Sequence, residues 1–96
     1  MSVLVQVGGL LKPETDQDAL AAVTREFLGK METVPGFQKA VQLVNPLTRY
    51  FQGMIYFADD ESAEAFLSGE NSAHFGLFEP LATGDDIMLA RMHVIE

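Results

Sequence analysis

Apolar residues in this chain either alternate with polar ones or return every three to four positions, and each period marks a type of element. Residues 3–7 carry valine at every second position, which is typical of a strand. Between residues 16 and 33, apolar side chains recur at spacings of three and four, as on one face of an amphipathic helix. Residues 37–44 and 49–57 favour strands, and the turn at 45–48 joins them as a hairpin.

The rest of the chain continues with a helix and a strand. Asp59 or Asp60 can cap a helix that ends at Ser68 and Gly69. A short helix is expected at 71–78, before Pro80, and the last strand at 87–95. The order β-α-β-β-α-β predicts a ferredoxin-like α+β fold, with an antiparallel four-stranded sheet and helices on one face. Gly8 and Gly9 are expected to close the first strand or to form a bulge.

Alternation along each strand divides the expected sheet into two faces. The sides formed by Val3, Val5 and Val7, by Phe51, Ile55 and Phe57, and by Met88, Ala90, Met92 and Val94 should lie under the helices. The opposite, open face should carry Leu4, Gln6, Tyr50, Gln52, Met54, Tyr56, Leu89, Arg91, His93 and Ile95. A sheet face open to water would be more polar, so an interface or a ligand cavity is expected there. Residues 37–44 fit either facing, because a bulge would change their register.

Length and composition add an expectation about assembly. Ninety-six residues suit one domain over residues 1–96, and 48% hydrophobic residues are enough for a packed core. A domain this small buries a modest share of its surface, and without cysteine it has no disulfides to compensate. Self-association is the remaining common solution, so we expect a homodimer formed through the sheet face.

The net charge of −8 excludes several classes of partner. Nucleic acid and anionic membranes are bound through clustered Lys and Arg, of which the chain has only six in total. We therefore expect no nucleic-acid partner and no membrane. A cytoplasmic location is expected because no apolar run reaches the roughly 20 residues that span a bilayer, and no basic region precedes an apolar stretch at the N-terminus. The acidic groups at 59–61 and 85–86 suit helix capping and turns, so no metal site is expected. The Gly8-Gly9 pair lacks the rest of a phosphate-binding fingerprint, so nothing in the sequence supports nucleotide binding.

Three segments resemble the antibiotic-biosynthesis-monooxygenase-like family of dimeric α/β-barrel proteins. They are Val34-Pro35-Gly36-Phe37, the run from Phe57 to Phe66, and Ser72-Ala73-His74-Phe75. The resemblance implies a dimeric α/β barrel and cofactor-independent oxygenation of a small aromatic or polyketide-like phenol. A base would deprotonate the phenol, and the electron-rich anion would react directly with dioxygen.

The chain departs from that family at one position with consequences for function. Many members have a tryptophan at the end of the third strand, where this chain has Phe57, and tryptophan is absent altogether. Some members also use an Asn on the first strand, for which Gln6 is the nearest counterpart. This departure weakens the alternative of a haem-binding or haem-degrading protein and leaves the polyketide-type oxygenase without its usual support.

The candidate catalytic residues are His74, His93 and Arg91. Imidazole titrates near neutral pH and suits a general base, while Arg91 could hold an anionic oxygen. The structural alternatives are a helix histidine bonded to backbone and an interface arginine paired with a carboxylate.

The candidate substrate-binding residues are Gln6, Tyr50, Gln52, Tyr56 and Phe75. Tyrosine and glutamine could orient a phenol in a pocket on the open sheet face, although tyrosine is also common in dimer interfaces. A small-molecule-binding or regulatory dimer without catalysis is therefore a further alternative.

Overall fold

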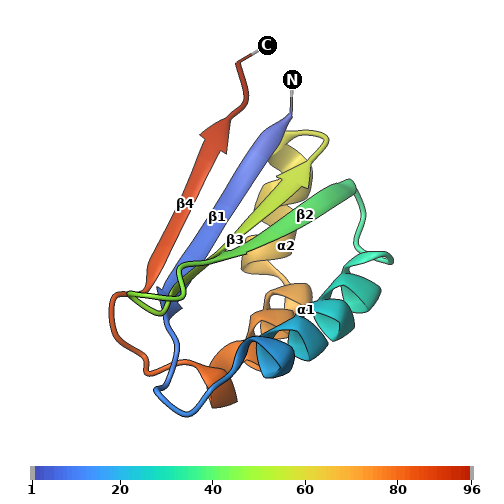
Figure 1. Ribbon diagram of the computed structural model, residues 1–96. Coiled ribbons are helices and arrows are strands. Elements are labelled where there is room, and N and C mark those ends of the chain that lie inside the picture. The colour runs from blue at the N-terminus through green and yellow to red at the C-terminus, as the bar shows by residue number, and fades with distance from the viewer. Residues whose placement is uncertain (1, 96) are drawn as a thin grey trace.

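The computed structural model describes residues 2–95, which form one sheet and three helices on one of its faces. The strands lie in the order β2-β3-β1-β4, and every neighbouring pair is antiparallel. Figure 1 shows both α-helices and the orange 3₁₀ segment on the same side of the sheet. This arrangement confirms the predicted ferredoxin-like α+β fold. The elements are β1 (Val3–Leu10), α1 (Gln17–Met31), β2 (Phe37–Val44), β3 (Tyr50–Phe57), α2 (Asp60–Ser68), the 3₁₀ helix η1 (Glu70–Leu81) and β4 (Met88–His93).

Strand β1 continues through its two glycines, so the prediction that they close or bulge the strand is wrong. Gly8 pairs with Gln52, and Gly9 pairs with Phe51, in unbroken register. A Cβ atom on Gly8 would lie 2.7 Å from the Tyr50 hydroxyl. It would also lie 2.8 Å from the Phe51 backbone oxygen, which cannot easily move aside, so glycine is needed at this position.

A bulge in β2 resolves its facing. Phe37 pairs with Phe57, whereas Lys39 pairs with Tyr56, so one extra residue is accommodated between the two pairs. Residues directly opposite one another share a face of the sheet. Beyond the bulge, Ala40, Gln42 and Val44 therefore lie on the helix side, while Lys39, Val41 and Leu43 lie on the open face.

Strand β4 faces the opposite way from the prediction. Its partners on β1 are Val3 for His93, Val5 for Arg91 and Val7 for Leu89. The three valines belong to the helix side, and so do Leu89, Arg91 and His93. The assignment of Met88, Ala90 and Met92 to the core is wrong, because they lie on the open face. The charged side chains are accommodated on the helix side because carboxylates of α2 receive them there.

The core lies between the sheet and the helices. Phe57, Phe66, Met31 and Ile55 are among its largest fully buried side chains. Phe27 of α1 contacts both Phe75 and Phe78 of η1, with ring centroids 5.8 and 5.4 Å apart. Within residues 2–95 no helix covers the open face (Figure 1), where Val41, Leu43 and Met92 remain 41–47% exposed.

No helix within residues 2–95 is long and apolar enough to cross a membrane.

Helix α2 begins at a charged cap whose effect on stability depends on pH. The Asp59 carboxylate accepts a hydrogen bond from the Ser62 N–H at 2.8 Å, and this backbone bond holds the pKa of Asp59 below its ordinary value. A lowered folded-state pKa stabilises the protein above the unfolded-state pKa, and that contribution is lost as the pH falls below about 4.

We expect Asp59→Ser, which keeps a neutral capping oxygen, to lose less stability than the wild type between pH 5 and pH 3. Urea unfolding at both pH values measures the difference. Equal acid sensitivity in the two proteins would mean that the Asp59 cap does not contribute to it.

Candidate functional site

A cavity of about 570 Å³ lies between the helix side of the sheet and η1. This volume is within the range typical of small-molecule sites. The walls include three aromatic rings, from Phe51, Phe75 and Phe78. Exposed Ile87 and Leu89 also line the cavity, so its mouth lies at the edge formed by β4. The cavity is on the other side of the sheet from the pocket that the sequence predicted.

Glycines on the sheet create this space. Gly9 and Gly53 both lie on the helix side, where any larger residue would project into the cavity. A Cβ atom on Gly9 would lie 3.7 Å from the Asp85 backbone oxygen, and one on Gly53 would lie 3.5 Å from a Val7 methyl group, both ordinary contact distances. The packing of neighbouring residues therefore does not require glycine at either position. The recess exists because both positions lack a side chain.

The three-residue period of η1 decides which of its residues face the cavity. Ser72, Phe75 and Phe78 form one row that lines it, and Ala73, Gly76 and Glu79 form the adjacent row. His74 and Leu77 belong to the third row, which faces away. Leu77 packs against the main core.

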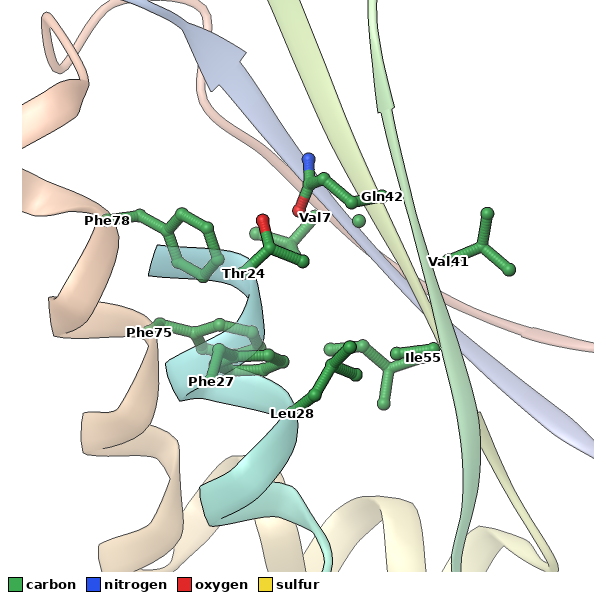
Figure 2. Close-up of a pocket in the computed structure, with 11 residues that line it drawn as sticks. Val7, Thr24, Phe27, Leu28, Val41, Gln42, Ile55, Phe75 and Phe78 are labelled. Carbon is green, nitrogen blue, oxygen red and sulfur yellow. The ribbon is translucent and has the colours of Figure 1, made fainter. Parts of the chain in front are cut away.

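A second, much smaller hollow of about 20 Å³ adjoins the cavity and is drawn in Figure 2. Helix α1 contributes Thr24, Phe27 and Leu28 to its wall. The side chain of Val41 points to the opposite side of the sheet in Figure 2, as its register requires. The volume is roughly that of one water molecule or another very small molecule. Both hollows are lined by Val7, Gln42, Gly53, Phe75 and Phe78.

Few polar side chains line the two hollows, and their hydrogen bonds define what each can offer. The Gln42 amide nitrogen donates to the backbone oxygens of Gln52 and Leu43, at 3.1 and 3.3 Å. Its oxygen therefore points the other way, into the pocket shown in Figure 2. Thr24 and Ser72 donate their hydroxyl protons to backbone oxygens, each at 2.8 Å. Glu79 adds a carboxylate at the surface.

Arg91 and His93 form a separate charged cluster with α2. The Arg91 guanidinium lies 2.7 Å from a Glu64 carboxylate oxygen, and His93 Nε2 lies 2.7 Å from Asp60 Oδ2. All four side chains are at least 39% exposed. Exposed pairs of this kind contribute little to stability and are screened by salt. The cluster places the charged side of β4 beside α2.

The predicted site residues are divided among these regions rather than gathered in one pocket. Gln6, Tyr50, Gln52 and Tyr56 lie on the open face, where the Lys39 ammonium sits 4.8 Å from the Tyr56 ring centroid. Phe75 lines the cavity. The three candidate catalytic residues are all on the helix side, but none of them lines the cavity.

Three polar residues of the cavity were not predicted from the sequence: Gln42, Ser72 and Glu79. A signal was present for the two residues of η1. They are seven positions apart, and small or aromatic residues fall between them at intervals of three. The bulge in β2 determines on which side of the sheet Gln42 lies, and alternation along the sequence does not reveal where a bulge occurs. Among residues 2–95, no group of three or more His, Cys, Asp or Glu side chains is placed to hold a metal ion.

A four-stranded antiparallel sheet with helices on one side only defines a ferredoxin-like fold. The chain shares its fold with a mutant form of SnoaB, a cofactor-independent oxygenase from Streptomyces nogalater, at 11% identity and a TM-score of 0.76. The match covers 99% of this chain and 94% of SnoaB.

Other solved structures lead to the same fold. An antibiotic biosynthesis monooxygenase matches at 17% identity with a TM-score of 0.71, over 98% of this chain and 99% of that one. A dimeric ferredoxin-like protein of unknown function from Thermobifida fusca matches at 9% identity with a TM-score of 0.72, over 98% and 92%. No family model matches the sequence, and no curated protein does. The resemblance predicted from the sequence is thus confirmed at the level of the fold.

Proposed function

We propose that this protein is a homodimeric, cofactor-independent monooxygenase-like enzyme that takes a small aromatic or polyketide-like phenol into the cavity beside η1. The observation that carries the proposal is the cavity itself, about 570 Å³ with aromatic walls and few polar side chains. Such a lining favours a flat apolar ring and leaves a small number of hydrogen bonds to orient it.

The proposed reaction needs one proton acceptor near the bound phenol. Glu79 is the titratable side chain that lines the cavity, whereas His74 is on the row of η1 that faces away. Deprotonation makes the ring electron-rich enough to pass an electron to dioxygen, and recombination forms a hydroperoxide. Loss of water then leaves a carbonyl on the ring, so one oxygen atom enters the product and the other leaves as water. The substrate supplies all the electrons.

Two features of the relatives support this proposal. SnoaB is a cofactor-independent oxygenase, and the Thermobifida fusca protein is dimeric. In this chain the open sheet face carries Leu4, Met54 and Tyr56 beside the exposed Val41 and Leu43. An apolar face of that kind suits a second copy of the chain.

Oxygen consumption by chelator-treated protein, measured with a panel of phenols and quinols, tests the proposal. We expect uptake of one dioxygen per substrate consumed. Glu79→Gln should lower the rate by about a hundredfold, the usual contribution of a general base. His74→Ala should stay within about twofold of the wild type, because His74 does not line the cavity. A complete lack of turnover across the panel would reject the enzymatic proposal.

One observation favours binding without turnover as the second candidate. Among the described residues that line the two hollows there is no Lys, Arg or His to stabilise a phenolate. A carboxylate beside the ring would oppose formation of that anion. Ligand binding that persists with no oxygen uptake, in the wild type and in Glu79→Gln alike, would select this candidate.

A further inference from the structure

We infer that the cavity selects its ligand by hydrogen-bond polarity: it binds aromatic molecules that donate hydrogen bonds and discriminates against anions and against molecules that only accept. This inference rests on the proposed use of the cavity as the ligand site and applies whether or not the bound molecule reacts. For a phenol oxidised at this site, it means that the phenol substrate binds more tightly than the quinone product.

The side-chain donors around the two hollows are already engaged in hydrogen bonds within the protein. The Thr24 hydroxyl donates to the Leu20 oxygen, and the Ser72 hydroxyl donates to the Gly69 oxygen, both at 2.8 Å. A hydroxyl has one proton to donate, so only its lone pairs remain for a ligand. The Gln42 amide nitrogen donates to two backbone oxygens. The amide oxygen could not replace it there because an oxygen without a proton cannot donate, so the orientation of the amide group is fixed.

The acceptors, in contrast, face the cavity. A Cβ atom on Gly53, at the cavity floor, would lie 3.7 Å from the Gln42 amide oxygen. Glu79 is acceptor-only when ionised. The main chain of the two floor glycines belongs to paired strands, so its N–H groups are occupied in the sheet. The side chains around the cavity thus offer acceptors on two opposite walls.

The surrounding charge acts in the same direction. Glu79 places a carboxylate on the wall of the cavity, and the Asp85 backbone oxygen, a further acceptor, lies 3.7 Å from the Cβ position of Gly9. No Lys or Arg is among the described residues that line the cavity, and the whole chain has a net charge of −8. A carboxylate or sulfonate on the ligand would meet like charge and find no side-chain donor.

Three naphthalenes of nearly equal size test the inference. 1-Naphthol donates a hydrogen bond, 1-methoxynaphthalene only accepts one, and 1-naphthoate is anionic at pH 7. Calorimetric titration under argon prevents oxidation. We expect 1-naphthol to bind about tenfold more tightly than 1-methoxynaphthalene, since a hydrogen bond to an ionised acceptor is among the stronger kinds. 1-Naphthoate should bind more weakly than either.

Variants at the cavity mouth provide the matched comparison. Glu79→Lys replaces an acceptor with a donor and should raise the affinity for 1-naphthoate, relative to 1-naphthol, by about tenfold in low salt. Glu32→Lys makes the same change of charge at the C-terminal end of α1, away from both hollows, and should leave the ratio unchanged.

Equal affinities for 1-naphthol and 1-methoxynaphthalene, or tightest binding of 1-naphthoate, would overturn the inference. So would an equal response to the two lysine variants. If none of the three probes binds, the inference and the proposed ligand site both fail. If 1-naphthol is selected but no phenol consumes oxygen, the inference stands and only the enzymatic proposal fails.

Discussion

Gly53→Val should weaken ligand binding by roughly tenfold or more without lowering the stability of the protein. The valine would stand on the cavity floor between β1 and β2, at a position that lines both hollows. Its Cβ atom would lie 3.5 Å from a Val7 methyl group and 3.7 Å from the Gln42 amide oxygen, which are ordinary contact distances. Its two methyl groups would occupy space that the ligand ring needs.

The stability expectation follows from the backbone. Glycine in a strand loses more conformational freedom on folding than valine, and a β-branched residue at such a site contributes up to about 1 kcal/mol. Most substitutions that impair function also destabilise, so a change with no loss of stability would identify the recess as a feature kept for binding. Urea unfolding and titration with 1-naphthol measure the two quantities on the same protein.

Gly29→Ala is the control for this experiment. Gly29 is on the exposed side of α1, and a Cβ atom there would meet nothing within 4 Å. Alanine should stabilise the helix by about 0.5–1 kcal/mol and leave the affinity unchanged. Unaltered binding by Gly53→Val, with the fold intact, would place the ligand somewhere other than this cavity.

The order of elements could be predicted because each has a strong local signal. The helix starts at Asp16 and Asp59 coincide with side chains that accept hydrogen bonds from backbone N–H groups three residues later. The hairpin at Asn45 is also local: its side chain accepts from the N–H groups of Leu47 and Thr48. Signals of this kind need no knowledge of the rest of the fold.

The facing of β4 could not be predicted in the same way. One of its sides is wholly apolar whereas the other carries Arg91 and His93, and we expected the apolar side to be buried. The side of β4 that faces the helices depends on contacts with α2, which is distant in sequence. Asp60 and Glu64 stand one turn apart on α2 and meet Arg91 and His93, which are two apart on one side of the strand. Matching these charge spacings would have indicated the correct side.

The reversal of β4 changes the character of the open face. Arg91 and His93 leave it, and Met88, Ala90 and Met92 take their place. The bulge in β2 adds Val41 and Leu43. The face is therefore more apolar than the sequence analysis supposed, which strengthens the case for a dimer interface and moves the case for a ligand site to the helix side.

Met54→Asp tests that interface, because Met54 lies in the central row of the open face. The row runs across all four strands through Val41, Met54, Gln6 and Ala90, which are direct partners in the sheet. We expect the wild type to be a dimer and the variant to dissociate at least about a hundredfold more readily. A carboxylate there would be buried against an apolar surface, and twofold symmetry introduces two copies of it.

Sedimentation velocity over a range of concentrations gives the mass of the assembly in both proteins. Leu47→Asp is the matched control, since Leu47 is 92% exposed in the β2–β3 turn and its replacement adds the same charge. It should remain dimeric. A monomeric wild type, or a Met54→Asp protein with unchanged mass, would show that the open face is not the dimer interface. The apolar row would then require another explanation, while the cavity on the helix side would remain open to the binding tests above.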